Sequence, residues 1–276
     1  DDYIYSQRQG ENISSLSLVQ PKRFGNLFIQ LANLIAVAKL NKIYMVYIPR
    51  ELEYIKFPQK LGIEIRYLNK GECVIDNNIA STYFYTDLYF DIATLKNRDQ
   101  IFKMFGQENI STQTVEEDAV AVHIRSGDIY SDGFVNSNYA QPPLSFYCRV
   151  LKKYLRQKIY IVTEDDTSPV LTPLKKWLDN LNVDYRVVGK NMLEAQQTLL
   201  SCSVIVLSRG TFILPLLNSI SGRQLYIYGS KGVGLRFTDL HGENVINVVS
   251  FDSYNAKLLN TYWCNGWLGR ALLVRT

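Results

Sequence analysis

The chain has 276 residues, of which 47% are hydrophobic and 20% are charged, and its formal net charge is +4. This length accommodates one large domain or two of average size, and the composition excludes a disordered or fibrous protein. The modest charge argues against nucleic acid as the main partner, whereas a local positive site for an anion is compatible with it.

The cysteines and the apolar runs indicate the compartment. Cys73, Cys148, Cys202 and Cys264 form no C-x-x-C pair, so we expect buried free thiols rather than a zinc site or a disulfide framework. No apolar run approaches the roughly 20 residues that span a bilayer, and no signal-peptide pattern is present. Because the sequence starts at Asp1 without Met, we expect either a cytoplasmic protein or one trimmed from a membrane-anchored form.

The first half opens with a strand, a turn and a helix. Residues 14–20 alternate like a short strand, and residues 27–40 have the pattern of a mostly buried helix of about four turns. Gly25 and Asn26 lie at the start of this helix, where backbone amides favour an anion, although a purely structural turn explains them equally well. Further expected elements are strands at 43–48, 63–68 and 73–75, a helix at 97–106 and a polar linker at 107–118.

From Ala119 onward strands and helices alternate regularly. This order predicts a parallel sheet covered on both faces, and ligands of such sheets bind beyond the carboxyl ends of the strands. We therefore predict an α/β fold with domains at 1–117 and 118–276. The expected strands are 119–125, 158–163, 184–188, 203–207, 224–228 and 245–249, and the expected helices are 144–156, 170–181, 192–201 and 211–219.

The strand ending at residues 123–128 is the first candidate site. Residues two apart on a strand share a face, so His123 and Arg125 point one way while Val122 and Ile124 point the other way. The planar fork of an arginine suits a phosphate or a carboxylate. A buried Arg–Asp pair that holds the strand end to a neighbour is the structural alternative.

The second candidate is Ser208-Arg209-Gly210-Thr211, which joins a predicted strand to a predicted helix. Its hydroxyls, free backbone amides and positive charge suit a pyrophosphate without a metal. A helix cap explains Ser208 or Thr211 but does not need Arg209.

An acidic turn is the third candidate. Glu164, Asp165 and Asp166 follow a predicted strand, where they suit a divalent metal or ribose hydroxyls and are equally good helix starters. The second histidine, His241, has no partner pattern. The motifs of P-loop kinases, α/β-hydrolases, zinc proteases and common NAD enzymes are absent.

Two segments resemble motifs of the α-1,2/α-1,6/protein-O-fucosyltransferase superfamily. Residues 122–128 (VHIRSGD) resemble its H-x-R-R-G-D signature, and residues 24–32 (FGNLFIQLA) are similar to the G-N-x-x-F-Q-x-A segment of its bacterial-type α-1,2 members. Residues 160–166 and 202–212 resemble two less specific segments. The resemblance covers most of the chain and implies a GT-B glycosyltransferase with two Rossmann-like domains facing across a cleft, an inverting reaction and a nucleotide-sugar donor bound without an essential metal.

The resemblance also implies residue roles. Arg125 is expected on the donor diphosphate with His123 beside it, and Ser208 and Thr211 are expected near the phosphates. The family's second motif arginine is Ser126 here, and Arg209 has no counterpart in the signature. We expect Arg209 to replace the missing charge, and the departure leaves two donors open, GDP-fucose and a UDP-sugar such as UDP-xylose.

The expected chemistry follows from charge. Cations held at the phosphates stabilise the charge that grows on the leaving diphosphate, which makes Arg125 and Arg209 the expected catalytic residues. Direct displacement also uses a carboxylate that accepts the proton of the acceptor hydroxyl. Asp128 is the first candidate for this base or, alternatively, an orienting partner of Arg125, and Asp132 and Asp76 are the next candidates. The remaining residues expected to bind the donor are Gly25, Asn26, Gly210 and Asp165.

The expected partners are a nucleotide sugar and a glycan or glycoprotein acceptor, with no cofactor and no nucleic acid. Two other functions stay open. One is a metal-dependent GT-A transferase in which Glu164, Asp165 and Asp166 hold Mn²⁺, and the other is a sugar- or nucleotide-binding module without catalysis.

Overall fold

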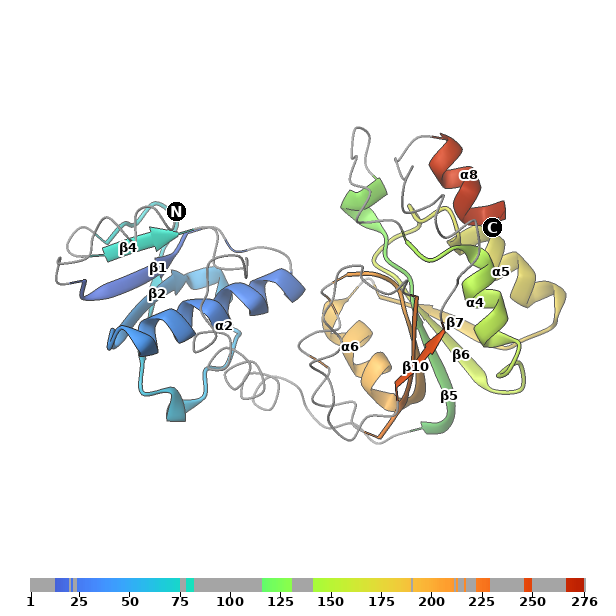
Figure 1. The fold of residues 1–276 in the computed structure, drawn as a ribbon, viewed down its shortest axis with the longest axis horizontal. Helices are drawn as coiled ribbons and strands as arrows, with labels where there is room; N and C mark the ends of the chain where they lie inside the picture. The colour runs from blue at the N-terminus through green and yellow to red at the C-terminus, as the bar shows by residue number, and fades with distance from the viewer. Residues whose placement is uncertain are drawn as a thin grey trace. The chain divides into compact units, whose positions relative to one another are not determined.

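The chain divides into two compact units, residues 1–111 with 211–219 and residues 112–210 with 220–276. Each unit has its own parallel sheet (Figure 1), which confirms the predicted α/β class. The domain boundary after residue 117 stays a prediction. The computed structural model describes residues 13–19, 21, 24–74, 78–81, 116–130, 141–189, 191–210, 212, 216, 222–228, 246–249 and 267–275.

The first unit has a parallel sheet with the strand order β3-β2-β1-β4. Helix α2 (Phe24–Leu40) connects β1 to β2 and packs on both, with Leu31, Leu34 and Ile35 fully buried. The strands are β1 (Ser15–Leu18), β2 (Met45–Pro49), β3 (Glu64–Leu68) and β4 (Asn78–Ser81), and two short 3-10 helices are η1 (Arg50–Leu52) and η2 (Gln59–Leu61).

The strand predicted at 73–75 is wrong for its described residues. Cys73 and Val74 are in no strand, and β4 pairs with β1 instead. The physical reason is topology: β3 and β4 lie at opposite edges of the sheet, so the residues between them form a crossover rather than a hairpin. Asn69 and Glu72 close the turn that starts this crossover, through a 2.6 Å bond from the Asn69 backbone amide to the Glu72 carboxylate. The helix predicted at 97–106 lies outside the described residues.

The second unit has a six-stranded parallel sheet with the order β10-β9-β8-β5-β6-β7. The chain adds β6 and β7 on one side of β5 and then returns to place β8 on the other side. This is the doubly wound arrangement, and its order reverses between β5 and β8. The strands are β5 (Glu116–His123), β6 (Lys158–Val162), β7 (Tyr185–Val188), β8 (Cys202–Leu207), β9 (Gln224–Tyr228) and β10 (Ile246–Val249).

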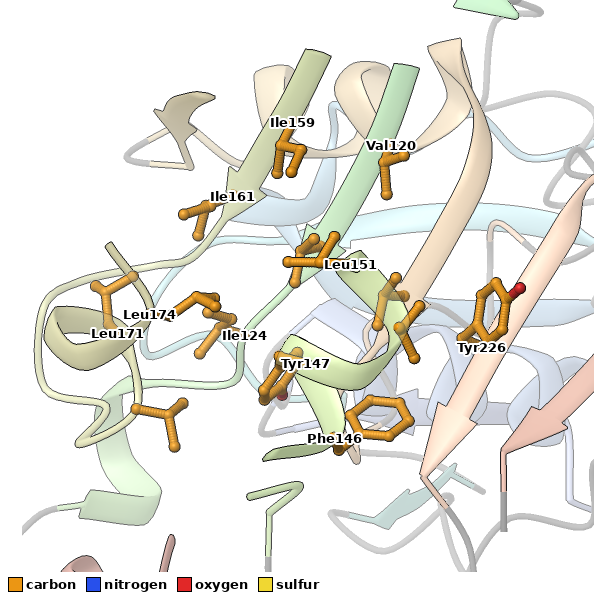
Figure 2. Close-up of a cluster of buried hydrophobic side chains, with 14 of the residues drawn as sticks. Val120, Ile124, Phe146, Tyr147, Leu151, Ile159, Ile161, Leu171, Leu174 and Tyr226 are labelled. Carbon is orange, nitrogen blue, oxygen red and sulfur yellow. The ribbon is translucent and has the colours of Figure 1, made fainter. Parts of the chain in front are cut away.

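Helices cover both faces of this sheet. Helices α4 (Leu144–Leu151) and α5 (Leu171–Asn180) lie on one face, and α6 (Met192–Ser201) lies on the other (Figure 1). Figure 2 shows the core under α4 and α5, where Val120 and Ile124 belong to the same buried cluster as Phe146 and Tyr147. His123 alternates with these residues and therefore faces the α6 side, as the strand pattern predicts.

Three expectations for the second unit need correction. Glu116 to Asp118 belong to β5 and not to the predicted linker, because the strand pairs with β8 from Glu116 onward. Helix α4 ends at Leu151 rather than at residue 156, since two tight turns, Lys153 to Val150 and Tyr154 to Leu151, redirect the chain toward β6. A helix not expected from the sequence, α8 (Trp267–Arg275), is anchored by a 2.7 Å bond from Arg270 to the carbonyl of Tyr130, at the end of the 3-10 helix η3 (Gly127–Tyr130).

The described cysteines Cys73, Cys148 and Cys202 are free thiols; Cys202 is buried as predicted, whereas Cys148 is half-buried and Cys73 is exposed. Burial raises the pKa of Cys202 to about 12, which makes this thiol unreactive. Within the described ranges, every helix is too short or too polar to cross a membrane.

Candidate functional site at the sheet switch point

The fold brings the two candidate segments together at the carboxyl ends of β5 and β8. The backbone amide of Ser208 donates to the carbonyl of His123 at 3.1 Å, and Ser208 Oγ lies 2.8 Å from His123 Nδ1. Beyond the strands, a Cβ placed on Gly210 would lie 3.9 Å from Cδ of Arg125. Residues far apart in sequence therefore meet at the point where the strand order reverses, which is where doubly wound sheets bind ligands.

His123 is a buried imidazole. The residue is 9% exposed. Burial and, second to it, the positive charge of Arg125 lower the pKa of His123 to about 3. The ring is therefore neutral at physiological pH and contributes hydrogen bonds rather than charge.

Arg125 holds its guanidinium at the edge of the site. Its side chain is 21% exposed, and Nη2 lies 2.5 Å from Oδ1 of Asp128 while Nη1 lies 3.9 Å from Oε2 of Glu164. Asp128 thus occupies the position of an orienting partner, which the sequence leaves open beside the role of base. The short contact with Asp128 orients the guanidinium, and the carboxylate of Glu164 lies farther away.

Arg209 supplies the second guanidinium at this edge. Its guanidinium carbon lies over the ring of Tyr228, the last residue of β9, at 5.5 Å from the ring centroid. Burial lowers the pKa of Arg209, while the phenol of Tyr228 acts in the opposite direction. A cation in such surroundings is stabilised by an anion more strongly than one in water, because the lower dielectric strengthens the attraction.

Ser126 has a buried hydroxyl just beyond the end of β5. The residue is 1% exposed, and its Oγ accepts bonds from the backbone amide of Asp165 at 3.1 Å and from the hydroxyl of Thr163 at 3.2 Å. This position therefore points into the turn between β6 and α5 and not toward the sheet edge. A larger side chain such as arginine would displace that turn.

Asp165 joins the turns after β5 and β6. Its Oδ1 accepts from the amide of Gly127 at 3.2 Å, the amide of Thr167 at 2.9 Å and the hydroxyl of Thr167 at 2.5 Å. Partial burial by itself raises the pKa of Asp165. The hydrogen bonds from Thr167, Gly127 and Ser126 together have a larger effect, and the pKa is lowered. Asp165 therefore connects the turns after β5 and β6, and its role in donor binding stays a prediction.

The acidic turn is not arranged as a metal site. Asp165 is engaged as described, Glu164 lies near Arg125, and the carboxylate of Asp166 lies 3.9 Å from Nζ of Lys175. Across the described ranges, no group of three or more His, Cys, Asp or Glu residues is placed to hold a metal ion.

Replacing Asp165 with asparagine should lower the melting temperature at neutral pH, because the shape is kept while the charge that strengthens these bonds is lost. The folded pKa is below the ordinary value of 3.8, so the stabilisation is complete above that value and disappears as the pH falls through the folded pKa. Thermal unfolding of both proteins between pH 7 and about pH 3 measures this, and the gap between the two melting temperatures should narrow as the pH falls below 3.8. Asp166→Asn is the matched control and should change little; a constant gap for Asp165→Asn at all pH values would contradict the role.

The other predicted site residues are placed as follows. Gly25 and Asn26 lie in the first turn of α2 in the first unit. Thr211, Asp132 and Asp76 lie outside the described residues. Two contributors, Thr163 and Tyr228, were missed; their only signal in the sequence is that each comes at the end of an apolar strand next to the switch point.

Comparison with known proteins gives similarity in structure but not in sequence. No protein-family model and no curated protein matches the chain. The chain is similar to a family 9 glycosyl transferase of Veillonella parvula, with a TM-score of 0.48 and 11% identity over 95% of this chain and 93% of that one. It is also similar to POFUT1 in complex with GDP (TM-score 0.43, 8% identity, 79% of this chain and 99% of that one).

A third similar structure is the E. coli heptosyltransferase WaaC with ADP-2-deoxy-2-fluoro heptose, at a TM-score of 0.42 and 10% identity over 85% of this chain and 92% of that one. Likeness at this level carries no argument about activity. The strand order defines the fold of each unit, and the function has to be argued from the residues at the switch point.

Proposed function

We propose that the protein is a GT-B glycosyltransferase that transfers a sugar from a nucleotide-sugar donor to a glycan hydroxyl by direct, inverting displacement without a metal ion. The proposed donors are GDP-fucose and a UDP-pentose such as UDP-xylose. The donor diphosphate binds at the carboxyl ends of β5 and β8.

One observation carries the proposal: two guanidinium groups, from Arg125 and Arg209, follow the two strands that flank the switch point. The bonds between His123 and Ser208, 3.1 Å along the backbone and 2.8 Å between the side chains, hold these strand ends together. A doubly wound sheet offers its ligand crevice at this edge, and a pair of arginines suits the paired phosphates of a nucleoside diphosphate.

The reaction needs cations at this position. When the bond between the sugar and the diphosphate breaks, negative charge grows on the departing phosphate and positive character grows on the sugar. Arginines already held in place stabilise that charge without reorganisation at the moment of reaction. Arg125 is oriented by Asp128 and Arg209 by the ring of Tyr228, so both meet this condition.

Asp128 is assigned to orientation rather than to proton transfer. Its Oδ1 lies 2.5 Å from Nη2 of Arg125, and an oxygen engaged with a guanidinium is a weak acceptor for a hydroxyl proton. The base for the acceptor hydroxyl is therefore proposed to come from another residue.

A screen of nucleotides and nucleotide sugars tests the proposal. A GDP- or UDP-linked sugar should raise the melting temperature, and the free sugar should appear slowly by hydrolysis at the same rate with and without excess EDTA. Loss of turnover in EDTA would support a metal-dependent transferase, whereas stabilisation without any hydrolysis or transfer would support a binding module. No stabilisation by any nucleotide would overturn the proposal.

The same screen measures the contribution of Arg209. Arg209→Ala should raise the dissociation constant of the nucleotide about tenfold to hundredfold, because a charge-assisted bond to a phosphate contributes about 1.5–3 kcal/mol. Arg186→Ala is the matched control, since this arginine is exposed on β7 and pairs with Glu194 at 3.0 Å. An unchanged dissociation constant for Arg209→Ala would remove Arg209 from the site.

A further inference from the structure

The side-chain contact between Ser208 and His123 is closed off from solvent. Ser208 is 6% exposed and His123 is 9% exposed, and the two side chains are joined by the 2.8 Å contact between Oγ and Nδ1. The backbone hydrogen bond from Ser208 to His123 holds the two residues in register and keeps their side chains next to each other.

The position of the proton in this contact follows from counting donors and acceptors. A serine hydroxyl carries one proton, and leaving it without an acceptor in a buried site costs about 1–3 kcal/mol. Across the described residues, Nδ1 of His123 is the one side-chain partner of Ser208 Oγ. The hydroxyl satisfies its proton only by donating to Nδ1, which then has to be the unprotonated nitrogen.

We propose that Ser208 is a positioning residue that holds His123 as the neutral tautomer with its proton on Nε2. The proposal rests on the proposed function for its consequence at the donor. It replaces the direct phosphate contact that the sequence implied for Ser208, because a hydroxyl that donates its proton to Nδ1 has none to donate to a phosphate.

The charges around the ring support the same form. The charged group that acts on His123 is Arg125, which disfavours a positive charge on the imidazole. On the neighbouring strand β6, the residue paired with His123 is the apolar Val162. Burial and Arg125 together lower the pKa of His123 to about 3.

This tautomer limits what His123 can do in the proposed reaction. With Nδ1 engaged and Nε2 protonated, the ring has no lone pair for a substrate proton and does not serve as a general base. It carries an N–H group near Arg125 and adds no charge to the site.

Nitrogen-15 NMR of the full chain tests the tautomer directly, because the protein has only two histidines, His123 and His241. Long-range proton–nitrogen spectra of histidine-labelled protein distinguish the two neutral tautomers and the imidazolium. His241→Gln assigns the signals. We expect the Nε2–H pattern for His123, unchanged from pH 8 to about pH 5. An Nδ1–H pattern, or a titration midpoint close to the ordinary value of 6.5, would overturn the proposal.

Two variants separate positioning from mere packing. Ser208→Ala removes the hydroxyl and should produce a mixture of tautomers for His123, whereas Ser208→Thr keeps the hydroxyl and should restore the Nε2–H pattern. An unchanged pattern in Ser208→Ala would contradict the role of the hydroxyl. If Ser208→Ala does not fold, the wild-type and Ser208→Thr spectra still decide the tautomer.

The same spectra keep this inference separate from the proposed function. Adding GDP or UDP should shift the His123 signals and leave the His241 signals in place. A locked tautomer without any nucleotide-induced shift would support the role of Ser208 while counting against the nucleotide site. A nucleotide-induced shift of the His123 signals together with the Nδ1–H tautomer would support the nucleotide site and contradict the role of Ser208.

Discussion

Replacing Arg125 with alanine is expected to lower kcat/KM for sugar transfer by about 10²–10³-fold, the usual effect of removing one preorganised donor to a developing negative charge. The fold should be retained, because the side chain is at the sheet edge and its partners Asp128 and Glu164 are each about half exposed. Steady-state kinetics with the donor found in the screen measure the effect.

Arg156→Ala is the matched control for this variant. Arg156 is an exposed arginine in the turn before β6, at the amino ends of the strands and away from the site. Its removal therefore changes the net charge equally without altering the site. Its kcat/KM should stay within about twofold of wild type. Near-normal turnover by Arg125→Ala would contradict the proposed catalytic role of Arg125.

Replacing Gly189 with alanine is expected to destabilise the second unit by about 3 kcal/mol, the largest stability effect predicted for a single methyl group here. Gly189 has φ of 137°, and an added Cβ would overlap the carbonyl oxygen of Thr163 and lie 2.9 Å from its carbonyl carbon. Both obstacles are backbone atoms that β6 and β7 hold in place, since the amide of Thr163 donates to Val188 at 2.9 Å.

Gly222→Ala separates the overlap from the backbone strain. Gly222 also has positive φ, 77°, but no heavy atom of the described structure lies within 4 Å of an added Cβ. Strain alone should lower its stability by about 1–2 kcal/mol. Urea unfolding followed by circular dichroism compares the two variants, and equal losses would contradict the steric overlap with Thr163.

The Gly189 variant should also affect the site. Thr163 donates to Ser126 at 3.2 Å and to the carbonyl of Asp165 at 3.0 Å, so a shift of Thr163 moves the turn that supports Arg125. Activity loss larger than the loss of folded protein would therefore be expected from Gly189→Ala.

Local patterns in the sequence predicted the six strands of the second unit and its helices α4, α5 and α6, but not α8. Apolar runs such as Val120 to Ile124 form strands because their side chains pack on the pleated surface, and their alternation correctly predicted that His123 faces away from the main core. The order of strand and helix then implied a parallel sheet. The patterns failed where a boundary depends on distant partners, as at Glu116, whose place in β5 comes from its pairing with β8.

The site divides in the same way. The sequence alone determines that polar residues follow the ends of two strands: Arg125, Asp128, Ser208 and Arg209. Because the carboxyl ends of parallel strands lie on the same side of a sheet, this pattern suits an anion. Only the tertiary structure decided that β5 and β8 are neighbours, since strand order depends on crossovers that no local pattern encodes.

The tertiary structure also decided what each polar group does. It placed Asp128 on Arg125, Ser208 on His123 and Asp165 on the turns beneath them. Hydrogen-bond partners depend on three-dimensional proximity to within a few tenths of an ångström, whereas the sequence specifies only which groups are available.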